Sequence, residues 1–273
     1  MVHSAASMAA AAKLYFFYRM EQQPFFSIIT VTYNVVPVIG PTVRSIGEQS
    51  FTDFEWLVQD GASADGTPAL ARDAGIAHTR VWSEPDRGLY DAMNKAVAKA
   101  RGRYVVFLNA GDCFAGPDAL QRMHDCAEGL DPGVIYGQTQ LVDASGRVVG
   151  MRHLTAPRHL TWRSFGRGML VCHQAFAARR DLVEPYNLAY RFSADYDWCI
   201  RVLKKSPVNA YAGDAPIISF LSDGGLTDRN HKASLRERYR IMCHYYGTLP
   251  TIARHISFVP RYVLTKLKRK LRG

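Results

Sequence analysis

The sequence lacks the short motifs that mark several common enzyme classes. No GxGxxG follows the first strand-like segment, and neither GxxxxGKS nor GxxxxGKT occurs anywhere in the 273 residues. Dinucleotide-dependent oxidation and P-loop phosphate chemistry are therefore unsupported. GxSxG is absent too, which argues against a hydrolase built on a nucleophile elbow.

Cysteine is scarce and dispersed. The five cysteines are an odd number and contain no CxxC pair: Cys113, Cys126, Cys172, Cys199 and Cys243. This pattern excludes a disulfide framework and a zinc ribbon, and it fits a reducing compartment. We therefore expect a cytoplasmic protein whose core, drawn from 48% hydrophobic residues, needs no covalent or metal staple.

Long apolar runs are missing as well. A membrane-spanning helix needs about 20 apolar residues, and Lys13 interrupts the apolar stretch near the N-terminus. The same region lacks the basic start of a secretory signal. We expect residues 1–24 to be an extension outside the folded domain.

Positive charge is confined to the C-terminal part. Residues 229–273 hold 12 Lys and Arg and one acid, a net charge of +11, whereas residues 1–228 sum to −1. A nucleic-acid binder usually spreads its charge over the recognition domain, so we expect no nucleic-acid partner. A basic helical tail over 229–273 instead indicates an anionic membrane surface, with a solvated face as the alternative.

The end of this tail has the pattern of a basic amphipathic helix. Pro260 suits the first turn of a helix that runs to Arg272. Apolar side chains recur on one face, at Val263, Leu264, Leu267 and Leu271. Such a helix either lies on the inner face of the cell membrane, which makes the protein peripheral, or packs on the body with its charges in water.

Strand-like and helix-like segments alternate over the first ~110 residues. Runs rich in β-branched and aromatic residues predict strands over 25–34, 54–60, 80–84 and 104–109. Helical spacing predicts helices over 38–49, 67–74 and 88–100. This order predicts an α/β domain with a mostly parallel sheet.

The second half is less regular. Its patterns predict strands over 133–137, 139–143 and 147–149 around a turn, a loop over 179–190, a helix over 195–204 and a strand over 214–220.

Polar residues follow the strands of the first half, where ligands bind in such sheets. Carboxylates stand after three of the four strands, at Asp60, at Glu84 and Asp86, and at Asp112. Several carboxylates converging on one crevice indicate metal or polyol binding.

Four segments in order resemble family 2 inverting glycosyltransferases. They are SIITVTYN at 27–34, VQDGASADGT at 58–67, SEPDRGLYDAMN at 83–94 and LNAGD at 108–112. The resemblance covers about residues 25–228. Within the family, the sequence is similar to enzymes of bacterial exopolysaccharide, colanic-acid-type and lipopolysaccharide assembly. It implies a GT-A fold, with a Rossmann-like, mostly parallel central sheet, and a UDP- or GDP-sugar donor. We expect a nucleotide-sugar-binding half over 25–115 and an acceptor half over 116–228.

The resemblance assigns donor binding to the residues at the strand ends and on the helix after the third strand. They are Thr32, Tyr33, Asn34, Asp60, Asp86, Asp91, Asn94 and Asn109. Two alternatives remain open: Asp60 forms an Asx turn with Gly61, and Asn94 is a satisfied core amide.

Asn109-Ala-Gly-Asp112 stands where the family has its DxD element, which holds a divalent cation against the donor diphosphate. Asn109 and Gly111 replace acids of the pattern, so Asp112 is the remaining carboxylate. The resemblance implies Mg²⁺ or Mn²⁺, since phosphate supplies further oxygen ligands. His231 is a weaker candidate to reach the metal.

Two further segments fall on the acceptor or diphosphate side by resemblance. His173 and Gln174 belong to VCHQ, and Gly224 and Gly225 belong to SDGGLT. The alternative for His173 is a buried, hydrogen-bonded histidine.

Ser193-Ala-Asp-Tyr-Asp197 matches the position of the family's catalytic carboxylate. The resemblance makes Asp195 the general base and Asp197 the runner-up, with a helix N-cap as the alternative for Asp195.

These residues together predict an inverting glycosyltransferase. The acceptor is a hydroxyl of a glycan or of a polyprenyl-diphosphate-linked saccharide. A nucleotidyltransferase is one rival, but residues 34–41 contain no Lys or Arg for the basic loop it would need. A catalytically inactive nucleotide-sugar-binding protein is the other, because the DxD element is eroded.

Overall fold

The computed structural model describes residues 23–221 and 230–256. The expected extension over 1–24, Gly224 and Gly225 in the loop, and the amphipathic segment 260–272 lie wholly or mostly outside the described residues, as does the side chain of His231.

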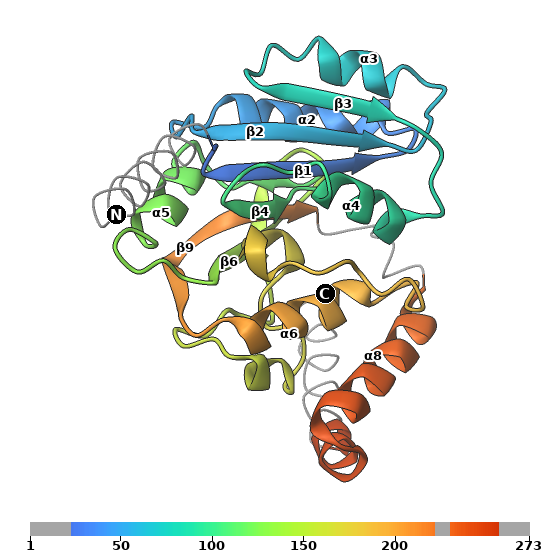
Figure 1. Cartoon of the computed structure of the whole chain (residues 1–273), viewed down its shortest axis with the longest axis vertical. Coiled ribbons are helices and arrows are strands. Elements are labelled where there is room, and N and C mark those ends of the chain that lie inside the picture. The colour runs from blue at the N-terminus through green and yellow to red at the C-terminus, as the bar shows by residue number, and fades with distance from the viewer. Residues whose placement is uncertain (1–22, 222–229, 257–273) are drawn as a thin grey trace, which may run out of the picture.

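A nine-stranded sheet forms the centre of the molecule (Figure 1). Its strands are β1 (Phe26–Thr32), β2 (Phe54–Asp60), β3 (Thr79–Ser83), β4 (Tyr104–Phe107), β5 (Cys113–Phe114), β6 (Val134–Val142), β7 (Val148–Met151), β8 (Phe176–Arg179) and β9 (Asn209–Leu221). The order is β3-β2-β1-β4-β8-β6-β9-β5, and β7 pairs with β6.

Strands β1 to β4 are mutually parallel, as the sequence predicts. Every residue of β1 and β2 is buried. Such strands need helices on both faces of the sheet. These are α2 (Val36–Gly47), α3 (Thr67–Arg72) and α4 (Leu89–Val97), with α4 packed on β1 and β2.

Strand β8 joins the two halves of the sheet, because it pairs antiparallel with β4 on one side and with β6 on the other. The sequence pattern does not predict this strand. The prediction of two strands over 133–137 and 139–143 is wrong, because β6 is continuous over Val134–Val142. The break expected at Gln138 is instead a register shift against β9. A Cβ at the neighbouring Gly137 would come within 2.9 Å of the Ile217 side chain, so a larger residue there would make Ile217 shift.

The remaining helices are α5 (Ala119–Asp125), α6 (Ala194–Lys205) and α8 (His231–Tyr246), with short 3₁₀ turns η1 (Trp162–Phe165), η2 (His173–Ala175) and η3 (Arg180–Leu182). Helix α6 covers the second half, and α8 packs against it. Ser193 Oγ donates to the Ser234 carbonyl across 3.2 Å and so fixes α8 beside the start of α6.

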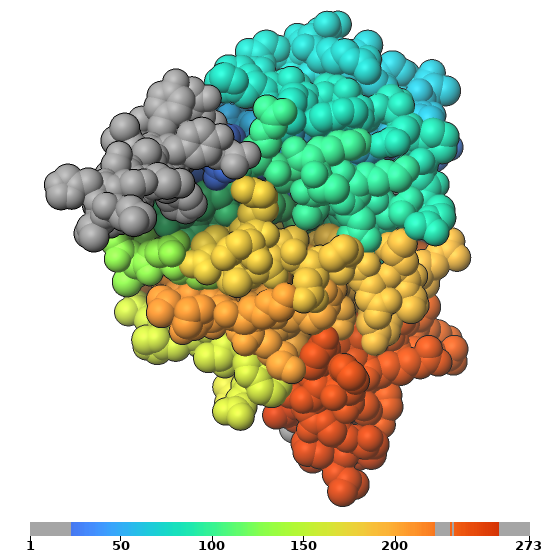
Figure 2. Space-filling view, in the orientation of Figure 1, coloured from blue at the N-terminus to red at the C-terminus, as the bar shows by residue number. Residues whose placement is uncertain are grey.

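The chain forms a further helical stretch over 248–256. Leu249, Ile252 and Ile256, spaced three and four residues apart, are exposed on it. The C-terminal helices project from the end of the molecule opposite β3 (Figure 2). No helix within the described residues is long and apolar enough to cross a bilayer.

Candidate active site

The carboxyl ends of β1, β2, β3 and β4 lie at the same end of the sheet, because these strands are parallel. Strand pairing places Thr32 opposite Asp60, and Asp60 opposite Ser83. The four segments singled out in the sequence are therefore brought to one edge, as expected for parallel strands.

Asp60 is fully buried beneath this edge. Its Oδ1 accepts hydrogen bonds from Thr32 Oγ1 (2.8 Å) and Ser63 Oγ (2.5 Å), and its Oδ2 accepts from Ser83 Oγ (2.7 Å) and the Ser63 N–H (2.8 Å). Burial raises the pKa of Asp60, but these hydrogen bonds outweigh burial and hold the pKa below its usual value. Four donors occupy the carboxylate, so Asp60 shapes the turn in this structure.

Tyr33 and Asp86 flank Gly61 at the surface. A Cβ at Gly61 would lie 2.6 Å from Asp86 Oδ2 and 3.3 Å from the Tyr33 ring. The Tyr33 ring is 66% exposed. Asn34 adopts a positive φ of 51°, and its Oδ1 accepts the Ala64 N–H (3.0 Å). An exposed ring, a carboxylate and a bare glycine form a surface on which a nucleoside can stack and hydrogen-bond.

Asp91 and Asn94 share a face of α4 but have different partners. Asp91 accepts from the backbone and side chain of Arg87, both at 3.0 Å. Asn94 pairs with both backbone groups of Tyr186: its Oδ1 accepts the N–H (2.6 Å) and its Nδ2 donates to the carbonyl (3.1 Å). This geometry agrees with the alternative reading of Asn94 as a core amide whose hydrogen bonds are satisfied. Asn94 thereby fixes the loop that contains Tyr186.

The turn after β4 carries two polar side chains, Asn109 and Asp112. The Asp112 N–H donates to the Asn109 carbonyl (3.0 Å), and Gly111 provides the positive φ of 97° that the turn requires. Asn109 Oδ1 is buried and has no hydrogen-bond partner among the described residues. Burial raises the pKa of Asp112 to about 7, against hydrogen bonds from Gln174 and the Leu221 backbone.

These two residues fit a divalent cation with few protein ligands. An orphaned amide oxygen and a buried carboxylate three residues apart are hard ligands of the kind that Mg²⁺ and Mn²⁺ take. Residues 23–221 and 230–256 contain no group of three or more His, Cys, Asp and Glu side chains that could hold a metal by itself. A cation held by Asn109 and Asp112 would take its other ligands from water or from substrate oxygens.

Gln174 and His173 are adjacent in the chain but have different hydrogen-bond partners. Gln174 Nε2 donates to Asp112 Oδ2 (2.7 Å), while its Oε1 accepts from the Cys172 thiol (2.8 Å). The His173 ring is only 4% exposed, stacks on Phe107 and shares a 2.6 Å hydrogen bond with the Tyr186 hydroxyl. Burial lowers the pKa of His173 to about 4, so the ring is neutral. His173 thus matches the buried alternative.

Asp195 lies in the first turn of α6 and is half-buried. Its Oδ1 accepts from the Tyr90 hydroxyl (3.1 Å) and from the Tyr196 N–H (2.9 Å). No donor within the described residues binds Oδ2, so that oxygen is available to a substrate. Burial and the charge of Asp195 raise the pKa of Tyr90 well above its usual value, which keeps the phenol a donor.

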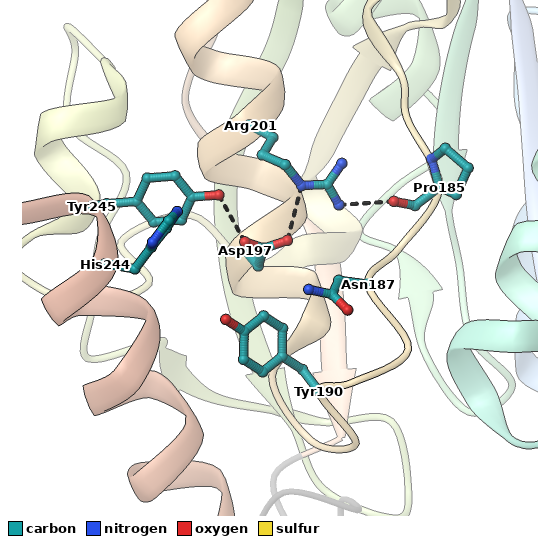
Figure 3. A pocket seen from close by; sticks show the side chains of 7 residues that line it. All are labelled: Pro185, Asn187, Tyr190, Asp197, Arg201, His244 and Tyr245. Atoms are coloured by element: carbon teal, nitrogen blue, oxygen red, sulfur yellow. Dashed lines mark hydrogen bonds and ion pairs between the residues drawn. The ribbon is translucent and has the colours of Figure 1, made fainter.

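Asp197 faces the other way, because two residues turn an α-helix by about 200°. Its carboxylate accepts from Arg201 Nε (2.9 Å) and the Tyr245 hydroxyl (2.8 Å). Figure 3 shows this group at a pocket of about 400 Å³ whose other lining residues are Pro185, Asn187, Tyr190 and His244. Both oxygens of Asp197 accept hydrogen bonds, whereas only Oδ1 of Asp195 does so among the described residues.

Two tyrosines of the site were not identified from the sequence. Tyr90 stands inside the 83–94 motif, one residue before Asp91, so its place beside candidate site residues was a signal. Tyr186 lies in an irregular loop, and only the fold brings it to Asn94 and His173.

Known proteins with similar sequences are glycosyltransferases and a chondroitin synthase. The model of glycosyl transferase family 2 matches residues 27–186. A PGL/p-HBAD biosynthesis glycosyltransferase of Mycobacterium bovis is 33% identical over 216 residues, which are 75% of this chain and 80% of that protein. A chondroitin synthase of Escherichia coli is 27% identical over 71% of this chain and 30% of its own length.

Solved structures share the architecture at low sequence identity. TarS of S. aureus in complex with UDP-GlcNAc has a TM-score of 0.66 at 16% identity, over 85% of this chain and 73% of that one. The mannosyltransferase PcManGT of Pyrobaculum calidifontis, in complex with GDP-Man and Mn²⁺, has a TM-score of 0.54 at 17% identity, over 99% and 90%. The fold is GT-A, as the sequence predicts. With the family model matching more than half of its length, the chain belongs to glycosyltransferase family 2.

Proposed function

We propose that this enzyme is an inverting, metal-dependent glycosyltransferase of bacterial surface polysaccharide synthesis. It moves a sugar from a UDP- or GDP-sugar to a hydroxyl of a glycan or lipid-linked saccharide. The observation that carries the proposal is the Asp195 carboxylate, whose Oδ2 is available while Tyr90 holds Oδ1. Structural neighbours that bind UDP-GlcNAc, or GDP-Man with Mn²⁺, support the donor class.

In this mechanism Asp195 Oδ2 takes the proton of the acceptor hydroxyl. The hydroxyl oxygen forms a bond to the anomeric carbon of the donor as the bond from that carbon to the diphosphate oxygen breaks. A single displacement from the opposite face inverts the configuration and needs no covalent enzyme intermediate. General base catalysis of this kind contributes roughly 10²–10⁴-fold.

Asn109 and Asp112 would hold a divalent cation, which neutralises charge on the departing nucleoside diphosphate. Gln174 keeps the Asp112 carboxylate in place through its 2.7 Å hydrogen bond. Tyr33, Asp86 and Gly61 form the surface proposed for the nucleoside.

We place the enzyme at an anionic membrane surface, where a lipid-linked acceptor resides. Leu249, Ile252 and Ile256 expose one apolar face of the stretch over 248–256. The net charge of +11 over residues 229–273 supplies attraction to acidic headgroups.

Donor profiling tests the proposed function. Thermal shifts are measured with UDP, GDP and their sugars, each with and without Mn²⁺, and the product released on turnover is then identified. Nucleoside diphosphate release with a metal-dependent shift is expected. Pyrophosphate release would indicate a nucleotidyltransferase, and donor binding without turnover over an acceptor panel would indicate a binding protein.

A further inference from the structure

The pocket of about 400 Å³ beside Asp197 lies between the loop after η3 and helices α6 and α8. The loop contributes Asn187 and Tyr190, α6 contributes Asp197 and Arg201, and α8 contributes His244 and Tyr245. Its volume falls in the range of roughly 300–1,000 Å³ that is typical of small-ligand sites. Asp195 is not among the lining residues, so the pocket is separate from the proposed reaction centre.

A hydrogen-bonded network fixes the walls of this pocket. Arg201 Nε donates to Asp197 (2.9 Å), and its Nη2 donates to the Pro185 carbonyl (2.8 Å), which ties the loop to α6. The Tyr245 hydroxyl donates to the other oxygen of Asp197 (2.8 Å), which ties α8 to the same carboxylate. The pocket is therefore formed before any ligand arrives, which lowers the entropic cost of binding.

The charged side chains of the network are paired with one another. Arg201 forms ion pairs with Asp197 and Glu184, both at 2.9 Å, and Lys205 pairs with Glu184 as well. Two acids and two bases thus cancel, and they offer no excess charge to a ligand. An ionic ligand would lack a counter-charge on this network, so the pocket favours a neutral one.

The loop residues present polar groups that have no partner. Neither the Tyr190 hydroxyl nor Asn187 Nδ2 forms a hydrogen bond within the described part of the chain, although Asn187 Oδ1 accepts the Ala189 N–H (3.0 Å). Figure 3 shows both side chains below the Asp197 carboxylate, with Arg201 and Tyr245 above it. The Tyr190 ring adds apolar surface next to these polar groups. A purely apolar ligand would leave the amide and the hydroxyl without partners.

We propose that this pocket binds a neutral saccharide unit of the acceptor glycan, on the opposite side of α6 from Asp195. A sugar ring matches the loop side of the pocket, because its hydroxyls can pair with an amide and a phenol while its C–H face packs on the tyrosine ring. The inference rests on the proposed function, which makes a glycan the acceptor. One helix, about 10–12 Å across with its side chains, separates the pocket from the base, and a chain of a few linked sugars spans that width.

Saturation-transfer difference NMR on the full chain tests this site. The probes are the methyl glycosides of D-glucose, D-galactose, D-mannose, L-rhamnose and N-acetyl-D-glucosamine, with D-glucose 6-phosphate as the charged competitor. Each glycoside is titrated with and without Mn²⁺ and saturating UDP or GDP. We expect at least one glycoside to bind, with an affinity that the nucleotide changes by less than twofold. Glucose 6-phosphate should not displace it.

Tyr190 allows a graded pair of variants. Tyr190→Ala removes the ring and the hydroxyl and should weaken glycoside binding at least tenfold. Tyr190→Phe keeps the ring and loses one hydrogen bond, so a loss of about threefold to fivefold is expected, and Asn187→Ala should have a similar effect. Leu188→Ala is the matched control, because Leu188 is exposed on the same loop but does not line the pocket. Nucleotide affinity should stay within twofold in all four variants.

Unchanged glycoside binding in Tyr190→Phe and Asn187→Ala would overturn the proposal even if Tyr190→Ala failed to fold, and so would a wild type that binds none of the five glycosides. Displacement by glucose 6-phosphate would also overturn it, because the ligand would then be an anion. A tenfold loss of nucleotide affinity in Tyr190→Ala would assign the pocket to the donor instead. If the wild type binds neither UDP nor GDP, the proposed function fails, and the glycoside titration still decides whether the pocket is a saccharide site.

Discussion

The Tyr90 hydroxyl donates a 3.1 Å hydrogen bond to Oδ1 of Asp195, although the two residues are 105 positions apart in the chain. Tyr90 belongs to α4 and Asp195 to α6. The bond therefore fixes the orientation of the proposed base against α4. It leaves the other oxygen, Oδ2, without a hydrogen-bond donor among the described residues.

Replacing Tyr90 with Phe removes this hydrogen bond and little else. A hydrogen bond to a charged group contributes about 1.5–3 kcal/mol, so we expect kcat to fall roughly tenfold or more. The KM for the nucleotide sugar should stay within about twofold, because Tyr90 contacts the base. Steady-state kinetics with varied donor measures both values, and an unchanged kcat would show that Asp195 needs no such orientation.

The second prediction separates the two carboxylates of Asp195-Tyr196-Asp197. Asp195→Asn keeps the shape of the side chain but cannot accept a proton, so turnover should fall by about 10²–10⁴-fold. Nucleotide affinity, measured by calorimetry, should be unchanged because the donor contacts lie elsewhere.

Asp197→Asn is the matched control for that variant. Asp197 is buried and bonded to Arg201 and Tyr245, so its loss should lower stability rather than catalysis. We expect a melting temperature several degrees lower and turnover within about fivefold of the wild type. The reverse result, with Asp197→Asn as the inactive variant, would transfer the role of base to Asp197.

The third prediction concerns the pH dependence of metal binding. Burial raises the pKa of Asp112 to about 7, so below that pH the carboxyl carries a proton that a cation must displace. The Mn²⁺ concentration for half-maximal nucleotide binding should be nearly constant above pH 8. It should rise by up to about tenfold per pH unit below pH 7.

Two variants check the assignment to Asp112. Gln174→Leu removes a hydrogen bond that favours the charged carboxylate, so the inflection should move to higher pH. Asp112→Asn should abolish the inflection together with most of the Mn²⁺ dependence. A wild-type requirement for Mn²⁺ that is flat from pH 5.5 to 8 would mean that Asp112 is not a ligand.

The first half of the fold follows from the sequence because its signals are local. Strand β2 has the predicted bounds, 54–60, and helices appear after each of the first three strands as predicted. Buried parallel strands are continuous apolar runs, which periodicity detects directly. The second half depends on long-range pairing: β8 is four residues long and is defined by its place between β4 and β6.

The site, like the fold, has features that local sequence signals predict and features that only long-range contacts create. Residue types at strand ends predicted which segments meet, since parallel strands place their carboxyl ends together. They did not predict the partners of each side chain. Asn94 bonds to Tyr186 and His173 lies against Phe107, and both contacts require the tertiary fold. The orphaned Asn109 Oδ1 likewise appears only in three dimensions.

The last prediction concerns the exposed apolar face at the C-terminal end of the described chain. Leu249, Ile252 and Ile256 are 80%, 41% and 66% exposed and lie on one face of a helix. Fully burying such a side chain contributes about 1.5–3 kcal/mol, and each nearby Lys or Arg adds about 1 kcal/mol at an anionic surface. We therefore expect the wild type to sediment with anionic liposomes and to be released partly by salt.

Changing all three residues to Ser should weaken binding at least tenfold while nucleotide affinity is retained. The matched control changes Leu130, Val148 and Val149, exposed at 53–56% on the body, to Ser and should bind like the wild type. Equal sedimentation of the two triple variants would show that this face does not contact lipid, and that the charge of residues 229–273 alone accounts for any binding.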